Sequence, residues 1–313
     1  MEEVVATRRG GPEVLELRTR ELVRDLRKAL VRVTAAGVGS ADREMLFGRF
    51  YAQPEFPFVS GYDLVGTVVG GALAGKLVAA MPRGGSWATE VQVDPRQLVV
   101  LPDGTDPAKA VALITDGVTA WRMVHRVATV RAGQTVLVHG ASGGVGRLLV
   151  QLARQAGASV VGTASAGRLT EVEALGAVAL DYRKPVQLDA DVVFDHIGGR
   201  HLVDSYRMLK PGGTLVSYGS KADGDASGSP LRPFLVIIAR LLGWEARRLT
   251  GLGRGRKTRL FNVKFDAAFP ADLNAVLRAD LDVPVTEYRL DDAKTALADF
   301  LDRRVTGKAV LVP

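Results

Sequence analysis

From about residue 106, short apolar runs alternate with helix-like segments, and a glycine-rich turn joins the first run to the first amphipathic helix. The apolar runs are four to six residues long, which is typical of strands buried on both faces of a sheet. Regular alternation of such strands with helices indicates a doubly wound parallel sheet. The sequence therefore predicts an α/β domain, with predicted strands at 135–139, 159–165, 177–182, 191–198 and 213–219.

The glycine-rich turn spans residues 140–146 and reads Gly-Ala-Ser-Gly-Gly-Val-Gly. It has the spacing of the dinucleotide-binding fingerprint, with alanine in the first glycine position. Gly143 would let the backbone approach a pyrophosphate, Gly146 would let the helix pack closely on the strand, and the helix N-terminus would supply amide donors. We therefore predict nucleotide binding, with a ligand-free turn as the alternative. The predicted contacts are Ala141, Gly143, Gly144, Val145 and Gly146.

The end of the next predicted strand bears on the choice between NAD and NADP. NAD sites usually place Asp or Glu about 20 residues beyond the glycines, where it accepts from the ribose 2′-hydroxyl. Here that position is Thr163, followed by Ser165 and Arg168. Two hydroxyls and a guanidinium suit a 2′-phosphate, because arginine pairs with phosphate through two N–H groups. We predict NADPH, although Arg168 in an ordinary solvated helix turn remains the alternative.

Residues 1–106 have a different texture, with short alternating stretches broken by glycine and proline. They predict a mostly-β, partly barrel-like domain. The last fifty residues contain further helix and strand patterns that could complete either domain. The predicted strands of the first region are 29–35, 65–69, 76–80, 89–93 and 97–101.

Composition excludes several classes of protein. The chain has no cysteine, which rules out disulfides and a Cys-ligated zinc and is compatible with a cytoplasmic location. The start of the chain does not resemble a signal peptide. Most of the net charge of +7 comes from the segment 240–259, and no nucleic-acid-binding motif accompanies it. We expect a cytoplasmic protein that does not bind nucleic acid.

Residues 221–259 are predicted to form an insertion in the α/β domain. Its apolar part, Phe234–Trp244, is too short to span a bilayer and too apolar to stand free in water. Three interpretations stay open for the segment. It walls a substrate cleft and contacts a second subunit, it docks on an anionic membrane through residues 230–259, or it belongs to the local core. The first predicts that Ile237 and Leu241 face another surface.

Several blocks together resemble the zinc-independent quinone oxidoreductase branch of the medium-chain dehydrogenase/reductase superfamily. They are Pro57–Val68, Asp116–Trp121, the glycine-rich turn, Ala177–Tyr182, Phe194–Gly199 and Gly307–Leu311, in the order and spacing of that family. The resemblance implies a GroES-like catalytic domain of residues 1–106 with 266–313, and a Rossmann NADPH-binding domain of residues 107–265. It further implies an active site in a cleft, Thr119 near the nicotinamide and Tyr182 at the 2′-phosphate end. Gly219 is a further expected cofactor contact.

The chain departs from zinc-dependent relatives and from many quinone reductases. The zinc-ligand block of the former reads Gly61-Tyr62-Asp63 here, and none of the four histidines pairs with another at helical spacing, so we expect no metal. An Asn and a Tyr that line the substrate site of many quinone reductases are replaced by Gly39 and Glu44. Catalytic candidates are therefore Glu44, Tyr51 and Thr119.

These observations predict an NADPH-dependent enzyme that transfers hydride to a quinone or to the β-carbon of an α,β-unsaturated carbonyl compound, and that forms a homodimer. The cofactor would carry the hydride, while the protein orients and desolvates the reactants. An enoyl reductase or tailoring enzyme of polyketide-type biosynthesis is an alternative, because the substrate positions differ from those of quinone reductases. A non-catalytic, membrane-associated nucleotide-binding protein is the alternative from another class.

Overall fold

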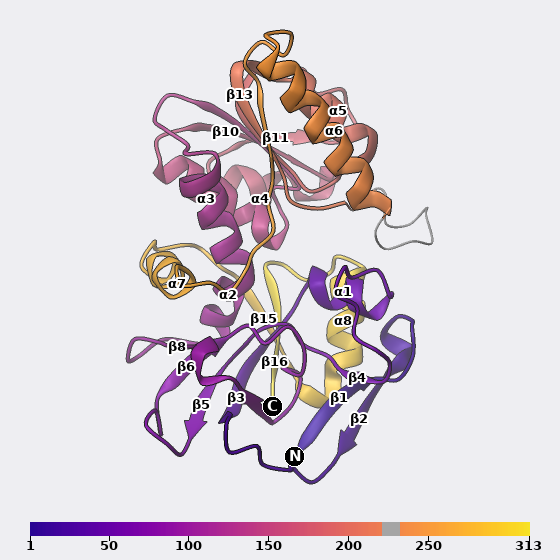
Figure 1. The fold of residues 1–313 in the computed structure, drawn as a ribbon, viewed down its shortest axis with the longest axis vertical. Coiled ribbons are helices and arrows are strands. Elements are labelled where there is room, and N and C mark those ends of the chain that lie inside the picture. The colour runs from indigo at the N-terminus through magenta and orange to yellow at the C-terminus, as the bar shows by residue number, and fades with distance from the viewer. Residues whose placement is uncertain (221–231) are drawn as a thin grey trace. The chain divides into compact units, whose positions relative to one another are not determined.

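The computed structural model describes residues 1–220 and 232–313, and the chain divides into two compact units (Figure 1). The first unit contains Met1–Val118 and Lys264–Pro313, and the second contains Thr119–Val263. The division falls inside helix α2 (Pro107–Arg122) rather than at residue 106. The earlier part of α2 belongs to the first unit, where Thr115 Oγ1 donates a hydrogen bond to Asp63 at 2.5 Å.

The first unit is mostly β and contains two sheets. The larger has seven strands in the order β15-β16-β3-β5-β6-β8, with β7 also paired to β3, and the smaller has the order β2-β1-β4. The strands are β1 (Glu2–Ala6), β2 (Leu15–Thr19), β3 (Ala29–Val38), β4 (Phe58–Val59), β5 (Leu64–Val69), β6 (Leu77–Ala80), β7 (Glu90–Val93), β8 (Leu98–Val100), β15 (Val285–Arg289) and β16 (Lys308–Val312).

Aliphatic side chains from both ends of the chain fill the core of the first unit. Val31, Leu64 and Leu311 are among the buried residues, and Trp87 lies with them and donates its indole N–H to the Gly37 carbonyl at 2.9 Å. The last fifty residues therefore complete this unit, because β16 pairs with β3 in the larger sheet. Its helices besides α2 are α1 (Ser40–Leu46), α7 (Phe269–Leu277) and α8 (Ala293–Leu301).

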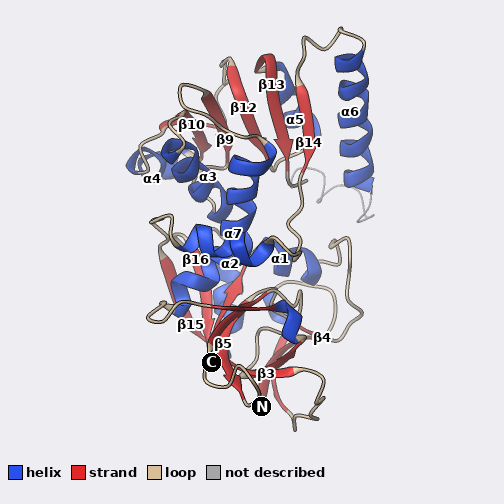
Figure 2. Ribbon diagram, turned by 60° about the vertical axis from the view of Figure 1, so that its left-hand side comes forward, coloured by secondary structure: helices blue, strands red, loops and turns tan. Residues whose placement is uncertain are grey.

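The second unit is the predicted doubly wound sheet, with six parallel strands in the order β11-β10-β9-β12-β13-β14 (Figure 2). Helices α5 and α6 pack on one face through Leu202, Tyr206, Ile237 and Leu241. Because crossovers between parallel strands are right-handed, α3 and α4 cover the other face. The elements are β9 (Thr135–His139), α3 (Gly144–Gln155), β10 (Ser159–Ala164), α4 (Leu169–Ala174), β11 (Val178–Asp181), β12 (Ala190–Asp195), α5 (Gly199–Arg207), β13 (Leu209–Ser217), α6 (Arg232–Leu249) and β14 (Lys257–Leu260).

The predicted insertion 221–259 is wrong in its described part. Helix α6 and strand β14 form the last crossover of the sheet, and Figure 2 shows α6 alongside β14. Ile237 is 0% exposed and Leu241 6%, because both pack against the sheet instead of a separate surface. The start of the segment, 221–231, lies outside the described residues. Among the described helices, none is long and apolar enough to cross a membrane.

Candidate cofactor site

The candidate site lies in the second unit, where the carboxyl ends of β9 and β12 lie side by side. Val138 pairs with Phe194, so the loops that follow the two strands leave the sheet at neighbouring points. The chain order reverses at this place, since β10 continues from β9 in one direction and β13 continues from β12 in the other. In open α/β sheets such a switch point is where ligands bind.

The glycine-rich turn brings helix α3 very close to strand β9. Gly140 has a φ of +67°, and a Cβ atom added at Gly146 would lie 2.1 Å from the Gly140 carbonyl oxygen. At Gly143, the residue before the first helical residue, an added Cβ would lie 3.3 Å from the same oxygen. Gly146 therefore permits the close packing of helix on strand. The first amides of α3, including those of Gly144 and Val145, have no partner within the helix, which is the arrangement that suits an anion at a helix N-terminus.

The carboxylate of Asp195, the last residue of β12, organises the loop that follows this strand. It is 0% exposed, and its Oδ1 accepts hydrogen bonds from the amides of Ile197 at 2.7 Å and Gly198 at 3.0 Å. Its Oδ2 accepts from Ser205 Oγ at 2.6 Å and from His201 Nδ1 at 3.0 Å. Four donors compensate the buried charge, as burial of a carboxylate requires. Although burial raises the pKa of Asp195, the hydrogen bonds from His201 and then Ser205 help to bring that pKa below its usual value.

A chain of hydrogen bonds connects Asp195 with the glycine-rich turn and determines the tautomer of His139. The Ser205 hydroxyl gives its single hydrogen to Asp195, so His139 Nε2, 3.2 Å from that oxygen, is the donor. His139 Nδ1 then accepts from Thr163 Oγ1 at 3.1 Å, and Thr163 Oγ1 accepts from the Gly140 amide at 3.4 Å. Burial lowers the pKa of His139 to about 3. The ring is therefore neutral, as the hydrogen bonds with Thr163 and Ser205 require.

His139, Asp195 and His201 are residue types that bind metals, and one ligand atom of each lies within 4.8 Å of the others. The sequence did not reveal this group, because its members come from β9, β12 and α5. The rings of His139 and His201 meet edge to face, with their centroids 4.1 Å apart. Both ring nitrogens of His139, Nδ1 of His201 and Oδ2 of Asp195 already form hydrogen bonds with protein groups. These three residues are therefore part of a hydrogen-bonded network.

The residues predicted to bind a 2′-phosphate lie at the ends of β10 and β11. Ser165 follows β10, and its carbonyl accepts from the Arg168 amide at 2.8 Å. Tyr182 is exposed and is tied to the same place, because its amide donates to the Ala164 carbonyl at 3.1 Å. Thr163 does not join this group: it is 1% exposed, and its hydroxyl bonds to His139 instead.

Glu171 is a neighbour of Arg168 that the sequence prediction overlooked. Its carboxylate lies 3.8 Å from Arg168 Nε and 3.7 Å from the buried guanidinium of Arg147. The three-residue spacing of Arg168 and Glu171 along a helix is the signal that could have found the pair. Any anion bound by Arg168 would share that guanidinium with Glu171.

The predicted catalytic residues have unequal surroundings. Glu44 lies on α1, and its carboxylate is paired with Arg43 at 2.6 Å and with Arg49 at 3.2 Å. Tyr51 is exposed, and its ring lies 4.6 Å from that of Phe50. Thr119 is 8% exposed on α2, in the second unit.

Gly219, the remaining predicted cofactor contact, follows β13. An added Cβ atom there would lie 2.7 Å from the His196 carbonyl oxygen, so the loops after β12 and β13 are in close contact.

Comparisons with known proteins agree with this architecture. Residues 144–244 match the model of a family described as zinc-binding dehydrogenase. The chain is 28% identical over 304 residues to a mycocerosic acid synthase-like polyketide synthase of Mycobacterium tuberculosis, and 32% identical over 236 residues to the synaptic vesicle membrane protein VAT-1 homolog of Mus musculus. These matches include 90% and 69% of this chain. They span only 14% and 58% of the length of those two relatives.

Solved structures extend the similarity over the whole chain. The quinone oxidoreductase of Thermus thermophilus, solved alone and with NADPH, is 29% identical with a TM-score of 0.77, and the match covers 100% of both chains.

Proposed function

We propose that the chain is an NADPH-dependent oxidoreductase. Residues 144–244 match a family described as zinc-binding dehydrogenase, and the fold is that of a solved quinone oxidoreductase. The observation that carries the proposal is the close approach of α3 to β9 at Gly146, directly beside the switch point of the sheet. This arrangement fits a dinucleotide, because the helix N-terminus and its amides are positioned for a pyrophosphate. Ala141, Gly143, Gly144, Val145 and Gly146 would hold it.

We assign the adenosine end of the cofactor to the ends of β10 and β11. Ser165 and Arg168 would bind the 2′-phosphate, and the exposed ring of Tyr182 would pack beside it. Glu171 weakens the positive field of Arg168 without removing it, because the carboxylate is 3.8 Å from that guanidinium. The proposed preference is therefore for NADPH over NADH.

We propose that the substrate is a quinone or an α,β-unsaturated carbonyl compound. Bound NADPH would supply the hydride, and a substrate of this kind spreads the incoming charge onto oxygen, where one hydrogen-bond donor suffices. Thr119 and Tyr51 carry hydroxyls that serve this role in the proposal. Glu44 is the weakest catalytic candidate, because two arginines already occupy its carboxylate. Protonation of the product by water requires no further residue.

A second candidate substrate class is favoured by one observation. The similarity to the mycocerosic acid synthase-like polyketide synthase covers 90% of this chain, so an enoyl thioester of polyketide-type biosynthesis is the alternative acceptor. For the assembly, we propose a homodimer that acts on a small molecule in the cytoplasm.

The proposed function is tested by following NADPH oxidation with quinones, enones and enoyl thioesters in parallel. We expect turnover with one of these classes and loss of NADPH binding in Gly146→Val, whose side chain would collide with the Gly140 carbonyl. A protein that binds NADPH but oxidises it with none of the acceptors would support the non-catalytic alternative. A Gly146→Val variant that binds NADPH normally would remove the site itself from the proposal.

Arg168→Ala tests the assignment of the cofactor. A lost charge-assisted hydrogen bond of about 1.5–3 kcal/mol predicts a roughly ten- to hundredfold weaker affinity for NADPH, with NADH little affected. Equal losses for both cofactors would return Arg168 to a surface role. Arg131→Ala is the control, because Arg131 is exposed and precedes β9, at the opposite end of that strand from the glycine-rich turn.

A further inference from the structure

The side of α6 that faces away from the sheet is apolar over most of its length. Its exposed residues from 235 to 246 include no charged side chain. Leu235 is 63% exposed and Leu242 66%, two turns apart on the same side of the helix. An exposed apolar surface of this extent marks an interaction site. The exposed residues of this stretch are Leu235, Val236, Ile238, Ala239, Leu242, Gly243 and Ala246.

Exposed apolar and basic side chains follow at the C-terminal end of the helix. Leu249 and Leu252 are exposed there, and Arg247 and Arg254 are exposed beside them in the sequence. We call Leu235, Val236, Ile238, Leu242, Leu249 and Leu252, together with Arg247 and Arg254, the α6 patch.

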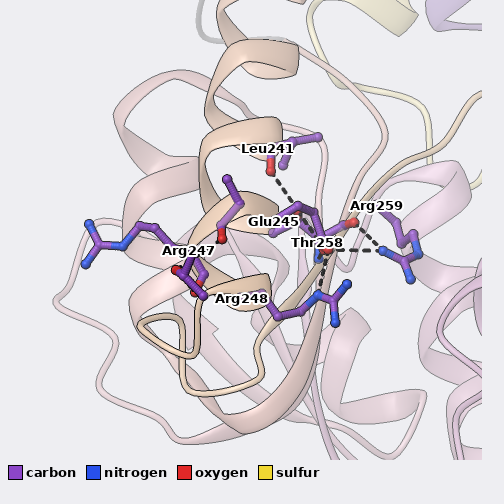
Figure 3. A network of polar contacts seen from close by, with 8 residues as sticks. Leu241, Glu245, Arg247, Arg248, Thr258 and Arg259 are labelled. Carbon is purple, nitrogen blue, oxygen red and sulfur yellow. Dashed lines mark hydrogen bonds and ion pairs between the residues drawn. The ribbon is translucent and has the colours of Figure 1, made fainter.

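Glu245 is the only acidic residue between 232 and 260, and its charge is neutralised within the unit. Its carboxylate accepts from the Thr258 amide and from Arg248 Nε, each at 2.6 Å, and lies 3.3 Å from an Arg259 nitrogen. Figure 3 shows Arg248 and Arg259 reaching toward Glu245, whereas Arg247 extends away from this network. The positive charge of the α6 patch is therefore not cancelled by Glu245.

We propose that the α6 patch docks on an anionic lipid surface. Aliphatic side chains would enter the boundary between headgroups and acyl chains, while Arg247 and Arg254 would lie among the anionic headgroups. Charge complementarity favours an anionic lipid surface over a second copy of the chain. Two copies of the patch placed face to face would bring their arginines together, which is unfavourable, whereas an anionic surface attracts them.

The chemistry of the patch also fits a membrane better than a nucleic acid. The exposed centre of the patch is aliphatic, whereas protein surfaces that bind nucleic acids combine phosphate contacts with aromatic side chains that stack on bases. Contact with the lipid would be peripheral, because no described helix is long and apolar enough to span a bilayer. The proposal does not depend on NADPH or on the substrate, so it stands apart from the proposed function.

Co-sedimentation of the full chain with lipid vesicles tests the proposal. We expect binding to vesicles of phosphatidylcholine with phosphatidylserine, weaker binding to phosphatidylcholine alone, and a decrease as salt is raised. Leu242→Glu should reduce the bound fraction roughly tenfold, because it places a charge in the apolar centre of the patch. The matched control is Leu26→Glu in the first unit, since Leu26 is 90% exposed and lies outside the patch.

Charge reversal separates the electrostatic part of the interaction. Arg247→Glu with Arg254→Glu should lower binding to the anionic vesicles and remove most of its salt dependence, whereas Arg27→Glu in the first unit should not. Unchanged far-UV circular dichroism will show that each variant is folded.

Several results would overturn the proposal. They are absence of vesicle binding, equal losses for Leu242→Glu and Leu26→Glu, and salt-insensitive binding to neutral vesicles. A wild-type dimer that Leu242→Glu dissociates, without vesicle binding, would assign the patch to a second copy of the chain. Binding to duplex DNA or RNA without vesicle binding would likewise reject a lipid surface.

Discussion

Each unit has a buried cluster of polar side chains, around Asp195 in the second unit and around Lys308 in the first. The two clusters differ in the ratio of carboxylates to hydrogen-bond donors. In the second unit, one carboxylate accepts four hydrogen bonds. In the first unit, Lys308 interacts electrostatically with three carboxylates, those of Asp42, Asp63 and Asp116, and lies 3.3 Å from the last. Negative groups are thus in excess around Lys308, whereas donors match acceptors around Asp195.

The difference shows how a buried charge can be stabilised. Hydrogen-bond donors keep Asp195 ionised. Around Lys308, burial and then the charge of Asp63 raise the pKa of Asp42 to about 7, so this cluster holds an additional proton near neutral pH. Asp42 Oδ1 also has no hydrogen-bond partner among the described residues. We therefore expect the first cluster to make stability depend on pH, while the network around Asp195 fixes the geometry of loops.

The largest effect is expected from Lys308→Met. Removal of the cation would leave carboxylates buried together, and breaking a buried ion pair typically lowers the free energy of unfolding by about 3–5 kcal/mol. Urea denaturation at neutral pH measures this loss, with Lys76→Met, an exposed position, as the control. The loss should shrink at pH 5, where the carboxylates take up protons. A decrease in the free energy of unfolding no greater than that of the control would mean that Lys308 does not stabilise the buried carboxylates.

Asp195→Asn should have the next largest effect. The amide keeps the shape but loses the charge, and hydrogen bonds to a charged group are worth about 1.5–3 kcal/mol. We expect a lower free energy of unfolding and weaker NADPH binding, because Asn offers one acceptor oxygen where Asp195 offers two. Either the amides of the loop after β12 or the pair Ser205 and His201 would then face an NH2 group. Asp204→Asn, on the exposed side of α5, is the control. If only stability falls and NADPH affinity stays the same, the network does not position the cofactor site.

Asp42→Asn should alter the pH dependence of stability. In the folded state Asp42 keeps its proton to about pH 7, whereas in the unfolded chain it releases it near its ordinary value, about 4. The folded protein binds more protons in between, so stability falls as pH rises through this range, by at most about 1.4 kcal/mol per pH unit. Thermal melts from pH 4 to 8 should show a flatter profile for the variant. An unchanged slope would contradict the raised pKa.

Thr163→Val should have the smallest effect, about 1 kcal/mol, while keeping the shape of the side chain. It removes the hydrogen bond to His139 Nδ1 and the long one, 3.4 Å, from the Gly140 amide. His139 Nδ1 would lose its donor, and the NMR signals of the imidazole would report the altered hydrogen bond. Identical imidazole signals in variant and wild type would show that Thr163 does not donate to this ring.

Local sequence patterns were sufficient for most of the second unit. Buried parallel strands are short apolar runs, so β9 and β10 were predicted within one residue of their observed bounds. β12 and β13 were also predicted, but β12 ends three residues before the predicted end and β13 begins four residues before the predicted start. Strand β14 was missed because it lies at the edge of the sheet, where Lys257 and Arg259 are exposed and Thr258 is buried against α6. Exposed basic residues on both sides of a buried threonine are typical of an edge strand, because edge strands carry charges that central strands do not. The prediction assigned this basic segment to an insertion instead.

From the sequence alone, the glycine spacing at 140–146 located the candidate nucleotide site, because that motif is a property of consecutive residues. Only the tertiary structure brought His139, Asp195 and His201 together and assigned the Thr163 hydroxyl to His139. It also placed Glu171 beside Arg147, and it divided α6 into a buried side and an exposed apolar side. Contacts of this kind depend on the register of parallel strands and on which face a helix turns to the sheet, and neither is determined by local spacing.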